Sequence, residues 1–246
     1  MTVARPETAV ILAAGEGRRL AGVWDRPKGL LRFGRETLIE RSLRLLRSRG
    51  LRRIVVVTGF QAEAYAAVLP EGVEIVSNPD FATTGSMASL ARALEVVKED
   101  FLLLESDLAY EARALDALLE HASVDVVLAS GPTGATDEVW IDAPEGRIRG
   151  LSKEAVAGAR HGEFAGLSRI SAPLAGMMIE AFNRFRAVSG HARMSYDSEA
   201  LPEAAARRPV ALLLIPDLRW GEVDDAFHFA RVRDRIWPHL DEPEEA

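Results

Sequence analysis

Basic residues gather beside a pair of glycines near the start of the chain, where they could hold an anion. The segment Leu12–Arg19 follows an apolar run, and Lys28 comes shortly after it. Residues 15–35 include six basic residues and two acidic ones, although the net charge of the chain is −7. Gly15 and Gly17 let the backbone approach a ligand and point N–H groups at it, which suits phosphate. The pattern is typical of a site for a small polyanion, with a nucleoside triphosphate as the leading candidate, and a tight turn with solvated arginines is the alternative.

Two well-known phosphate loops do not fit this segment. A dinucleotide-binding fingerprint needs a third glycine at the position of Leu20. A P-loop needs Gly-Lys-Ser/Thr, whereas the order here is Lys28 followed by Gly29. The glycine loop must therefore be interpreted together with residues elsewhere in the chain.

Composition excludes several classes of protein. With 246 residues and 48% hydrophobic side chains, the chain can form a sizeable core, and the absence of cysteine rules out disulfides and thiolate metal sites. No apolar run is long enough for a membrane span and no signal peptide is recognisable, so we expect a cytoplasmic protein. The acidic net charge argues against nucleic acid as a partner.

Apolar runs alternate with amphipathic segments, a pattern typical of an α/β fold with a mainly parallel, Rossmann-like sheet flanked by helices. The first half predicts strands at 8–13, 53–58, 73–76, 101–105 and 124–129, and helices at 38–49, 61–69, 87–97 and 112–121. The second half predicts a hairpin at 139–143 and 147–151, strands at 166–172 and 209–215, and helices at 174–188, 198–207 and 226–237. Ligands of such sheets bind at the carboxyl ends of the strands, where the glycine loop and Asp107 would both lie.

Several motifs in the same order resemble the nucleotidyltransferases of the sugar-phosphate type, and within them the small phosphocholine and 2-aminoethylphosphonate cytidylyltransferases. The motifs are the glycine loop, the Pro-Lys segment at Lys28, the strand ending at Asp107, the segments 78–81, 85–90, 138–140 and 196–197, and a late acidic loop. Arg18 departs from the pattern, because relatives usually carry Thr or Ser there, and its role is left open. We expect one domain over 1–240, with a nucleotide-binding half (1–130), a smaller mixed acceptor-binding region (131–225) and an acidic tail (241–246).

The resemblance implies transfer of a nucleotidyl group. Both reactants are anions, so bringing them together is the main obstacle and counter-charge is essential. Two like unit charges about 4 Å apart repel by about 4 kcal/mol at an effective dielectric of 20. We expect Arg19 to bind the leaving β- and γ-phosphates through forked hydrogen bonds, and Lys28 to act as a point charge at the α-phosphate.

A divalent ion bridging the phosphates would need oxygen ligands, and Mg²⁺ is the expected cofactor. Asp107 and Asp224 are the predicted ligands, since both would lie at the same edge of the sheet. Each aspartate could instead cap a helix, and Asp225 or Glu222 could replace Asp224 as a ligand.

The expected nucleotide site combines the loop with a later helix start. Ser86 could read the base, cap its helix, or do both. The predicted nucleotide-binding residues, with CTP as the expected triphosphate, are Leu12, Ala13, Ala14, Gly15, Gly17, Arg18, Gly85 and Ser86.

The resemblance places three aromatic residues around a small phosphate or phosphonate acceptor. Trp140, Tyr196 and Trp220, with a carboxylate nearby, could form a cage for a quaternary ammonium, or could belong to the core. A primary ammonium would instead prefer direct hydrogen bonds to carboxylates. Lys153, Arg160 and Arg169 could meet the acceptor's anionic group. The predicted acceptor-binding residues are Glu138, Trp140, Lys153, Tyr196, Asp197, Trp220 and Glu222.

Three functions remain open at this point. The first is cytidylyl transfer to an amino-alcohol phosphate or phosphonate, and the second is transfer to a sugar or polyol phosphate. The third is a nucleotide-sensing subunit without turnover, which would be expected to lack Lys28 or a metal carboxylate. The residues do not decide between a monomer and a homodimer.

Overall fold

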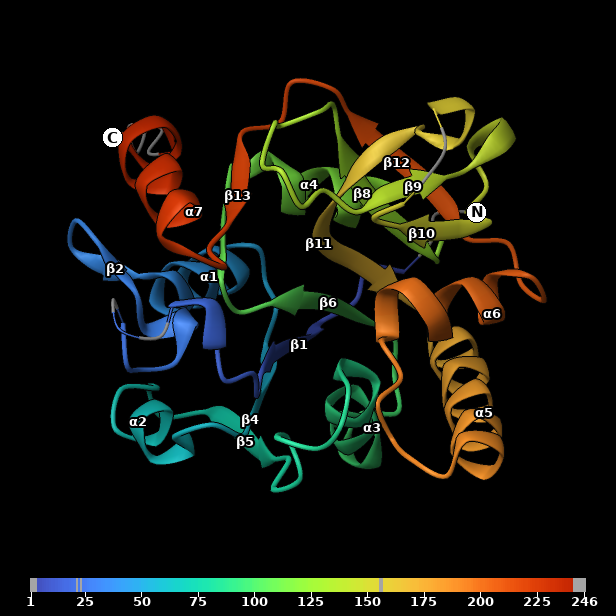
Figure 1. The fold of residues 1–246 in the computed structure, drawn as a ribbon, viewed down its shortest axis with the longest axis horizontal. Coiled ribbons are helices and arrows are strands. Elements are labelled where there is room, and N and C mark those ends of the chain that lie inside the picture. Colours follow the sequence, from blue (N-terminus) through green and yellow to red (C-terminus); the bar gives the residue numbers. More distant parts are fainter. Residues whose placement is uncertain (1–3, 21, 23, 155–156, 241–246) are drawn as a thin grey trace.

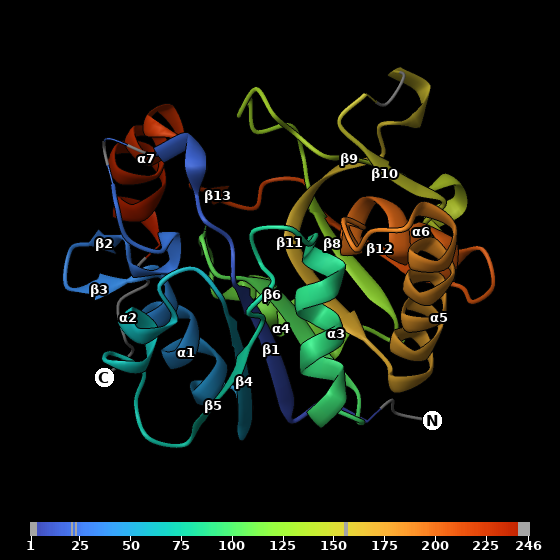
Figure 2. The same cartoon turned by 60° about the horizontal axis from the view of Figure 1, so that its bottom comes forward.

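The computed structural model describes residues 4–240 except residues 21, 23, 155 and 156. A central sheet lies between two layers of helices (Figures 1 and 2), as the alternation of apolar and amphipathic segments predicted. The acidic tail expected at 241–246 lies outside the described residues. Within the described residues, no helix has the length and apolar character needed to cross a bilayer.

Parallel strands form the first part of the sheet. In the three inner strands, Thr8–Ala13, Arg53–Thr58 and Phe101–Glu105, nearly all side chains are buried because helices cover both faces, whereas the edge strand Val73–Ser77 has only partly buried and exposed side chains. Val10 of the first strand lies between Val55 and Leu103 of its two parallel neighbours. The strands are β1 (Thr8–Ala13), β4 (Arg53–Thr58), β5 (Val73–Ser77) and β6 (Phe101–Glu105).

The same sheet continues into the second half of the chain through an antiparallel strand, β11 (Gly162–Ile170), which pairs with β6. In the described part of the chain, nine strands belong to this sheet, whose main path runs β10-β9-β11-β6-β1-β4-β5. The hairpin predicted around residues 144–146 is confirmed, since β9 and β10 pair in antiparallel fashion. The remaining strands are β8 (Val126–Ser130), β9 (Trp140–Asp142), β10 (Gly150–Ser152) and β12 (Ala211–Ile215).

Alternation along the strands divides the core between the two helical layers. Val10 belongs to the apolar cluster that includes residues of α3 (Ser86–Val96), α5 (Ala172–Ser189) and α6 (Leu201–Ala205) on one face, while Ile11 belongs to the cluster that includes residues of α1 (Leu38–Ser48) and α4 (Arg113–Glu120) on the other. Figure 2 shows α1 and α3 on opposite sides of β1. The short helix α2 (Ala62–Ala66) lies near the edge strand β5 in Figure 1.

A small antiparallel pair, β7 (Leu108–Tyr110) with β13 (Trp220–Glu222), joins distant parts of the chain. The sequence did not predict it, because three-residue strands carry little periodicity. A third apolar cluster lies below α7 (Ala226–Arg231) and includes Leu20, Phe33 and Val223. It also contacts the short hairpin of β2 (Arg32–Phe33) and β3 (Glu36–Thr37). The C-terminal helix is thereby held beside the glycine loop.

The strand expected at 166–172 was placed wrongly, since β11 begins at Gly162 and ends at Ile170. Gly166 has a φ of +73° and lies where the pairing of β11 with β8 shifts register between Phe164 and Ser168. It is therefore a bulge inside a longer strand, not the start of one. The helix expected at 61–69 is also shorter, at Ala62–Ala66.

Candidate active site

The glycine loop begins directly after β1 and is shaped around Lys28. Gly17 has a φ of +62°, which favours glycine. A Cβ atom at Gly17 would lie 2.9 Å from Cγ of Lys28, so a larger residue would displace the lysine side chain. The spacing that the sequence analysis singled out therefore gives the Lys28 stem room to cross the loop.

Lys28 lies between two aspartates that are 117 residues apart in the chain, Asp107 and Asp224. Its Nζ pairs with the Asp107 carboxylate and lies 2.7 Å from Oδ1 of Asp224. Burial lowers the pKa of Lys28, but the two carboxylates outweigh it and hold the pKa well above its usual value. The lysine is therefore charged, and it neutralises the pair that the sequence analysis assigned to a metal.

The two aspartates meet because of the pairing of β7 with β13. Asp107 follows β6, Asp224 follows β13, and the backbone N–H of Val223 donates to the Asp107 carbonyl at 3.1 Å. Each aspartate is only 6% exposed. Burial raises the pKa of Asp224, but Lys28 and Arg19 outweigh it and hold the pKa below its usual range. Asp224 is thus an ionised carboxylate in a largely buried position.

Arg19 reaches the same place from the glycine loop. Its guanidinium pairs with Asp224 and, at 3.0 Å, with Oδ2 of Asp137. About half of the Arg19 side chain is exposed, so it lies at the mouth of the site. Sequence reasoning missed Asp137, which lies in an irregular segment without periodicity and gave no signal beyond its neighbour Glu138.

A group of acidic side chains lies behind Lys28. Carboxylate oxygens of Glu105, Asp107 and Glu222 lie within 4.8 Å of one another, an arrangement that could hold a metal ion. Burial, followed by the charges of Asp107 and Asp197, raises the pKa of Glu105 to about 8. Burial likewise holds the pKa of Glu222 well above its usual range. The donor set consists of carboxylate oxygens, which suit a hard divalent cation such as Mg²⁺.

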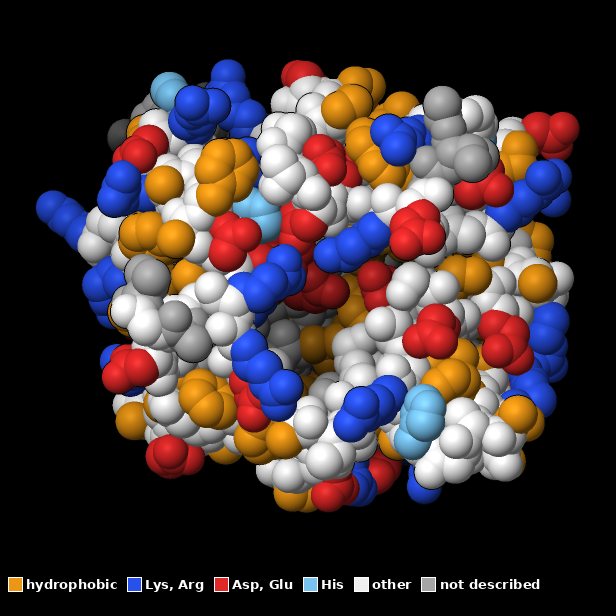
Figure 3. Space-filling model, viewed as in Figure 1, with side chains coloured by type: hydrophobic (Ala, Val, Ile, Leu, Met, Phe, Trp, Pro, Cys, Tyr) orange, Lys and Arg blue, Asp and Glu red, His pale blue; other side chains and the backbone are white. Residues whose placement is uncertain are grey.

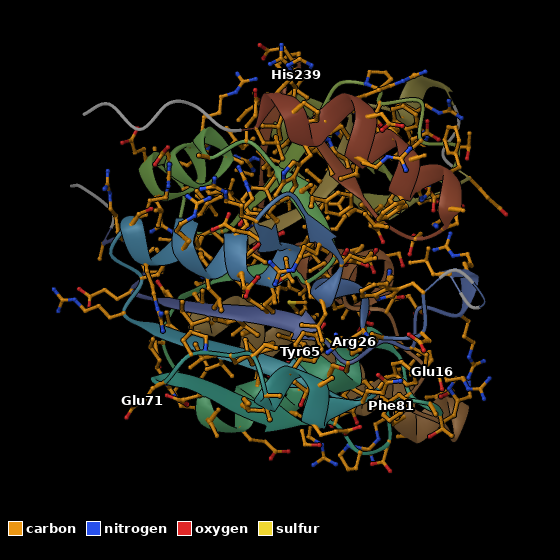
Figure 4. All side chains as sticks on the ribbon, turned by 90° about the vertical axis from the view of Figure 1, so that its left-hand side faces the viewer. Glu16, Arg26, Tyr65, Glu71, Phe81 and His239 are labelled. Atoms are coloured by element: carbon orange, nitrogen blue, oxygen red, sulfur yellow. The ribbon has the colours of Figure 1, made fainter. Side chains whose placement is uncertain are left out.

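Two cavities meet at this acidic group. The first has a volume of about 270 Å³ and the second about 150 Å³, and both are lined by Glu105 and Glu222. Figure 3 shows a hollow on this face, with acidic side chains in it and basic side chains at its rim. In Figure 4, Tyr65 and Phe81, which line the first cavity, lie at the carboxyl ends of the strands, whereas Glu71 lies at the opposite edge.

The first cavity contains most of the residues expected to bind the nucleotide. Lys28 and Asp107 line it as well, together with Tyr196, which was expected on the acceptor side. In the described part of the chain, Ala13, Gly17 and Arg18 are outside the lining of either cavity. Arg18 extends outward and pairs with Glu16. The nucleotide-binding candidates in the lining are Leu12, Ala14, Gly15, Gly85 and Ser86.

The second cavity contains most of the residues expected to bind the acceptor, but not as an aromatic cage. Trp220 is 6% exposed and its ring N–H donates to Ser130 at 2.7 Å. Trp140 is outside the described lining of both cavities, and the Arg160 guanidinium lies 4.8 Å from its ring centre. The acceptor candidates that line the second cavity are Glu138, Lys153, Asp197, Trp220 and Glu222.

Arg169 does not belong to the site. Its β11 position pairs with Leu102, near the start of β6, and its guanidinium donates to the backbone carbonyl of Ala4. Arg169 therefore lies at the amino-terminal edge of the parallel strands, opposite the edge at which Asp107 lies. The expectation that Arg169 meets the acceptor is wrong, because strand direction could not be inferred for an antiparallel insertion.

The fold and the site define a nucleotidyltransferase-type α/β domain. Residues 9–151 match the family described as MobA-like NTP transferase domain, and the chain belongs to that family. The resemblance stated from the motifs is thereby confirmed at the level of the family.

Known proteins similar to this chain carry names that describe different activities. A bifunctional IPC transferase and DIPP synthase of Thermococcus kodakarensis is 28% identical over 93% of this chain and 50% of its own length. A CMP-5'-(3-aminopropyl)phosphonate synthase of Streptomyces rubellomurinus is 34% identical over 52% of this chain and 21% of its own. The chain therefore spans half or less of these relatives.

A solved structure supports the same fold. The inositol-1-phosphate CTP transferase from T. maritima superposes with a TM-score of 0.76 and covers 97% of this chain and 99% of its own, at 18% sequence identity. At that identity, the similarity is evidence for the fold alone.

Proposed function

We propose that the protein transfers a cytidylyl group from CTP to a small phosphonate or phosphate that carries a primary ammonium group, with 2-aminoethylphosphonate as the type compound. The observation that carries the proposal is the convergence of Arg19, Lys28, Asp107 and Asp224 between two cavities that share a wall. Family membership and the relative named as a phosphonate CMP synthase support it.

In the proposed reaction, an ionised oxygen of the acceptor attacks the α-phosphorus of CTP. A new P–O bond forms, the bond to the oxygen that bridges the α- and β-phosphates breaks, and its electron pair leaves with pyrophosphate. The acceptor oxygen is already ionised, so no side chain has to remove a proton from it. The protein's task is to bring the anions together and stabilise the charge that develops on the leaving group.

Aspartates position the two cations of the site through ion pairs. Lys28 and Arg19 now pair with Asp107, Asp137 and Asp224, and they can exchange these partners for phosphate oxygens. Asp107 and Asp224, with Glu222 beside them, would hold a divalent cation, which when bound supplies positive charge at the phosphates. Lys28 would then contact the α-phosphate and Arg19 the leaving phosphates.

The lining of the second cavity supports a primary ammonium over a quaternary one. Carboxylates outnumber aromatic rings there, and the Trp220 ring is buried with its N–H engaged. An ammonium N–H can donate to these carboxylates, whereas a trimethylammonium has no hydrogen to donate and needs ring faces. The carboxylates that line the cavity are Glu105, Asp137, Glu138, Glu163, Asp197, Glu222 and Asp224.

A polyol phosphate is the second candidate acceptor. Hydroxyl groups also donate to carboxylates, and the solved structure that covers nearly the whole chain is named as an inositol-1-phosphate CTP transferase. The two candidates differ in charge, because only the ammonium compound would be attracted to the excess of acidic groups in the cavity.

A pyrophosphate-release assay tests the proposal. The protein is incubated with Mg²⁺, each of the four ribonucleoside triphosphates in turn, and 2-aminoethylphosphonate, phosphocholine or inositol 1-phosphate. We expect release with CTP and 2-aminoethylphosphonate. Release only with inositol 1-phosphate would transfer the assignment to the polyol class. Triphosphate binding without release in any combination would contradict an enzymatic role and favour a nucleotide sensor.

A further inference from the structure

The start of α3 is joined to a segment of the second half of the chain, residues 192–197. The backbone N–H of Gly85 donates to the Ala192 carbonyl at 2.8 Å, and that of Met87 to the Met194 carbonyl at 3.1 Å. A Cβ atom at Gly85 would overlap the Arg193–Met194 backbone, so only glycine allows this approach. Gly85 thus holds two halves of the chain together, in addition to lining the first cavity.

Ser86, the residue after Gly85, also contacts the segment 192–197. Its hydroxyl oxygen accepts a hydrogen bond from the backbone N–H of Tyr196 at 3.0 Å. A serine hydroxyl that accepts one hydrogen bond retains its own hydrogen to donate, and Ser86 lines the first cavity. Ser86 can therefore contact a bound nucleotide and hold Tyr196 at the same time.

Tyr196 continues the contacts to the wall between the cavities. Its side chain is 1% exposed, and its hydroxyl donates to Oε1 of Glu105 at 2.8 Å. Glu105 lines both cavities, and Asp197, the next residue after Tyr196, lines the second. A continuous path of contacts thus runs from the nucleotide cavity through Ser86 and Tyr196 to the acceptor cavity.

We propose that Ser86 and Tyr196 are positioning residues that couple the two cavities, so that a bound nucleotide holds the 192–197 segment in the arrangement that binds the acceptor. The coupling rests on the proposed function for its ligands, but it concerns a different property. A nucleotide that restrains the start of α3 reduces the ordering cost of acceptor binding, and by linkage the acceptor strengthens nucleotide binding by the same factor.

Calorimetry with α,β-methylene-CTP and Mg²⁺ measures the coupling without turnover. In the wild-type protein, we expect the analogue to tighten acceptor binding by about five-fold or more, which is the lower end of typical couplings between sites. Ser86→Ala and Tyr196→Phe should bring that factor to within about two-fold of unity. Ser86→Thr, which keeps the hydroxyl, should preserve it. The acceptor is the compound that turns over in the pyrophosphate assay.

Steady-state kinetics separates positioning from a simple nucleotide contact. Ser86→Ala should raise the KM for the acceptor by roughly two- to ten-fold, the range for loss of one neutral hydrogen bond. Ser171→Ala is the control, because Ser171 caps α5 by accepting from Leu174 and loses a comparable hydrogen bond away from both cavities. A rise in the KM for CTP alone, with the coupling factor unchanged, would overturn the proposal.

Hydrogen exchange gives a readout that needs no acceptor. Binding of CTP with Mg²⁺ should slow exchange of the Tyr196 amide in the wild-type protein but not in Ser86→Ala. The coupling would be contradicted if CTP slowed exchange of the Tyr196 amide equally in both proteins, or did not slow it in wild-type protein saturated with CTP. Neither result would contradict the proposed reaction. Failure to release pyrophosphate with any acceptor, with Tyr196 still protected by CTP, would instead contradict the reaction and support the coupling.

Discussion

The two cavities are built in different ways. The first is formed by strand ends, the glycine loop and the start of α3, so backbone and small residues make up much of its lining. The second is formed by charged side chains from segments far apart in the chain, including Arg19, Asp137 and Asp197. Under the proposed function, nucleotide binding would therefore depend on strand ends and backbone, whereas acceptor choice would depend on side chains that can change without altering the sheet.

Lys28 lines the first cavity, and its substitution should have the largest effect on activity. Lys28→Met should lower kcat by about 100-fold or more, as removal of a single transition-state donor does in other enzymes. It should also lower the Tm without metal, because Asp107 and Asp224 would be left buried without their cation.

Pyrophosphate release and thermal unfolding measure both effects. Lys98→Met is a control, since the Lys98 ammonium donates to the carbonyl of Leu94 and, in the described part of the chain, lies outside the lining of both cavities. Equal kcat values for Lys28→Met and wild type would remove Lys28 from the site.

Glu138 tests the second cavity. Glu138→Gln should raise the KM for an ammonium acceptor by about ten-fold, in keeping with the loss of a hydrogen bond to a charged group, and leave the KM for CTP unchanged. Trp140→Ala, on the same segment but outside the described lining, should change the acceptor KM less. A larger rise in the acceptor KM for Trp140→Ala would show that its ring contacts the acceptor and would contradict recognition by carboxylates alone.

Glu105 lies where the cavities meet, and its raised pKa predicts that stability depends on pH. Its pKa is about 8 in the folded protein and near 4.5 when unperturbed. Between these values the folded state keeps a proton that the unfolded state loses, so this group's contribution to stability falls as the pH rises.

The gain in Tm from Glu105→Gln over wild type should therefore increase from pH 5 to pH 8, by a few degrees, in thermal unfolding without divalent ions. Glu145→Gln, on an exposed turn, is the control. A Tm difference between Glu105→Gln and wild type that stays constant with pH would contradict the raised pKa.

Arg18 should show the smallest effect. It lies in the glycine loop but extends outward to Glu16, and three quarters of its side chain is exposed. Arg18→Ala should change kcat and both KM values by less than about two-fold, because an exposed ion pair contributes little. A large rise in the KM for CTP would show that the Arg18 side chain turns toward the first cavity when the nucleotide binds.

Sequence patterns predicted the first half of the molecule closely. The strands at 8–13, 53–58 and 101–105 were predicted at the observed residues, because continuous apolar runs are typical of parallel strands buried on both faces. Errors were concentrated around β11, where Gly166 lies in a bulge, and at the short strands β7 and β13, which are too short for periodicity to detect.

The types and order of the site residues were evident from the sequence alone: a glycine loop with Arg19 and Lys28, and carboxylates after later strands. Only the tertiary structure showed that Lys28 lies between Asp107 and Asp224 and that Asp137 and Glu105 belong to the site. It also showed that Trp140 and Arg169 lie outside the lining of the two cavities, within the described residues. The reason is physical. Local spacing determines backbone conformation and burial, but ion pairs between residues far apart in the chain, such as Lys28 and Asp224, depend on strand pairing that no local pattern encodes.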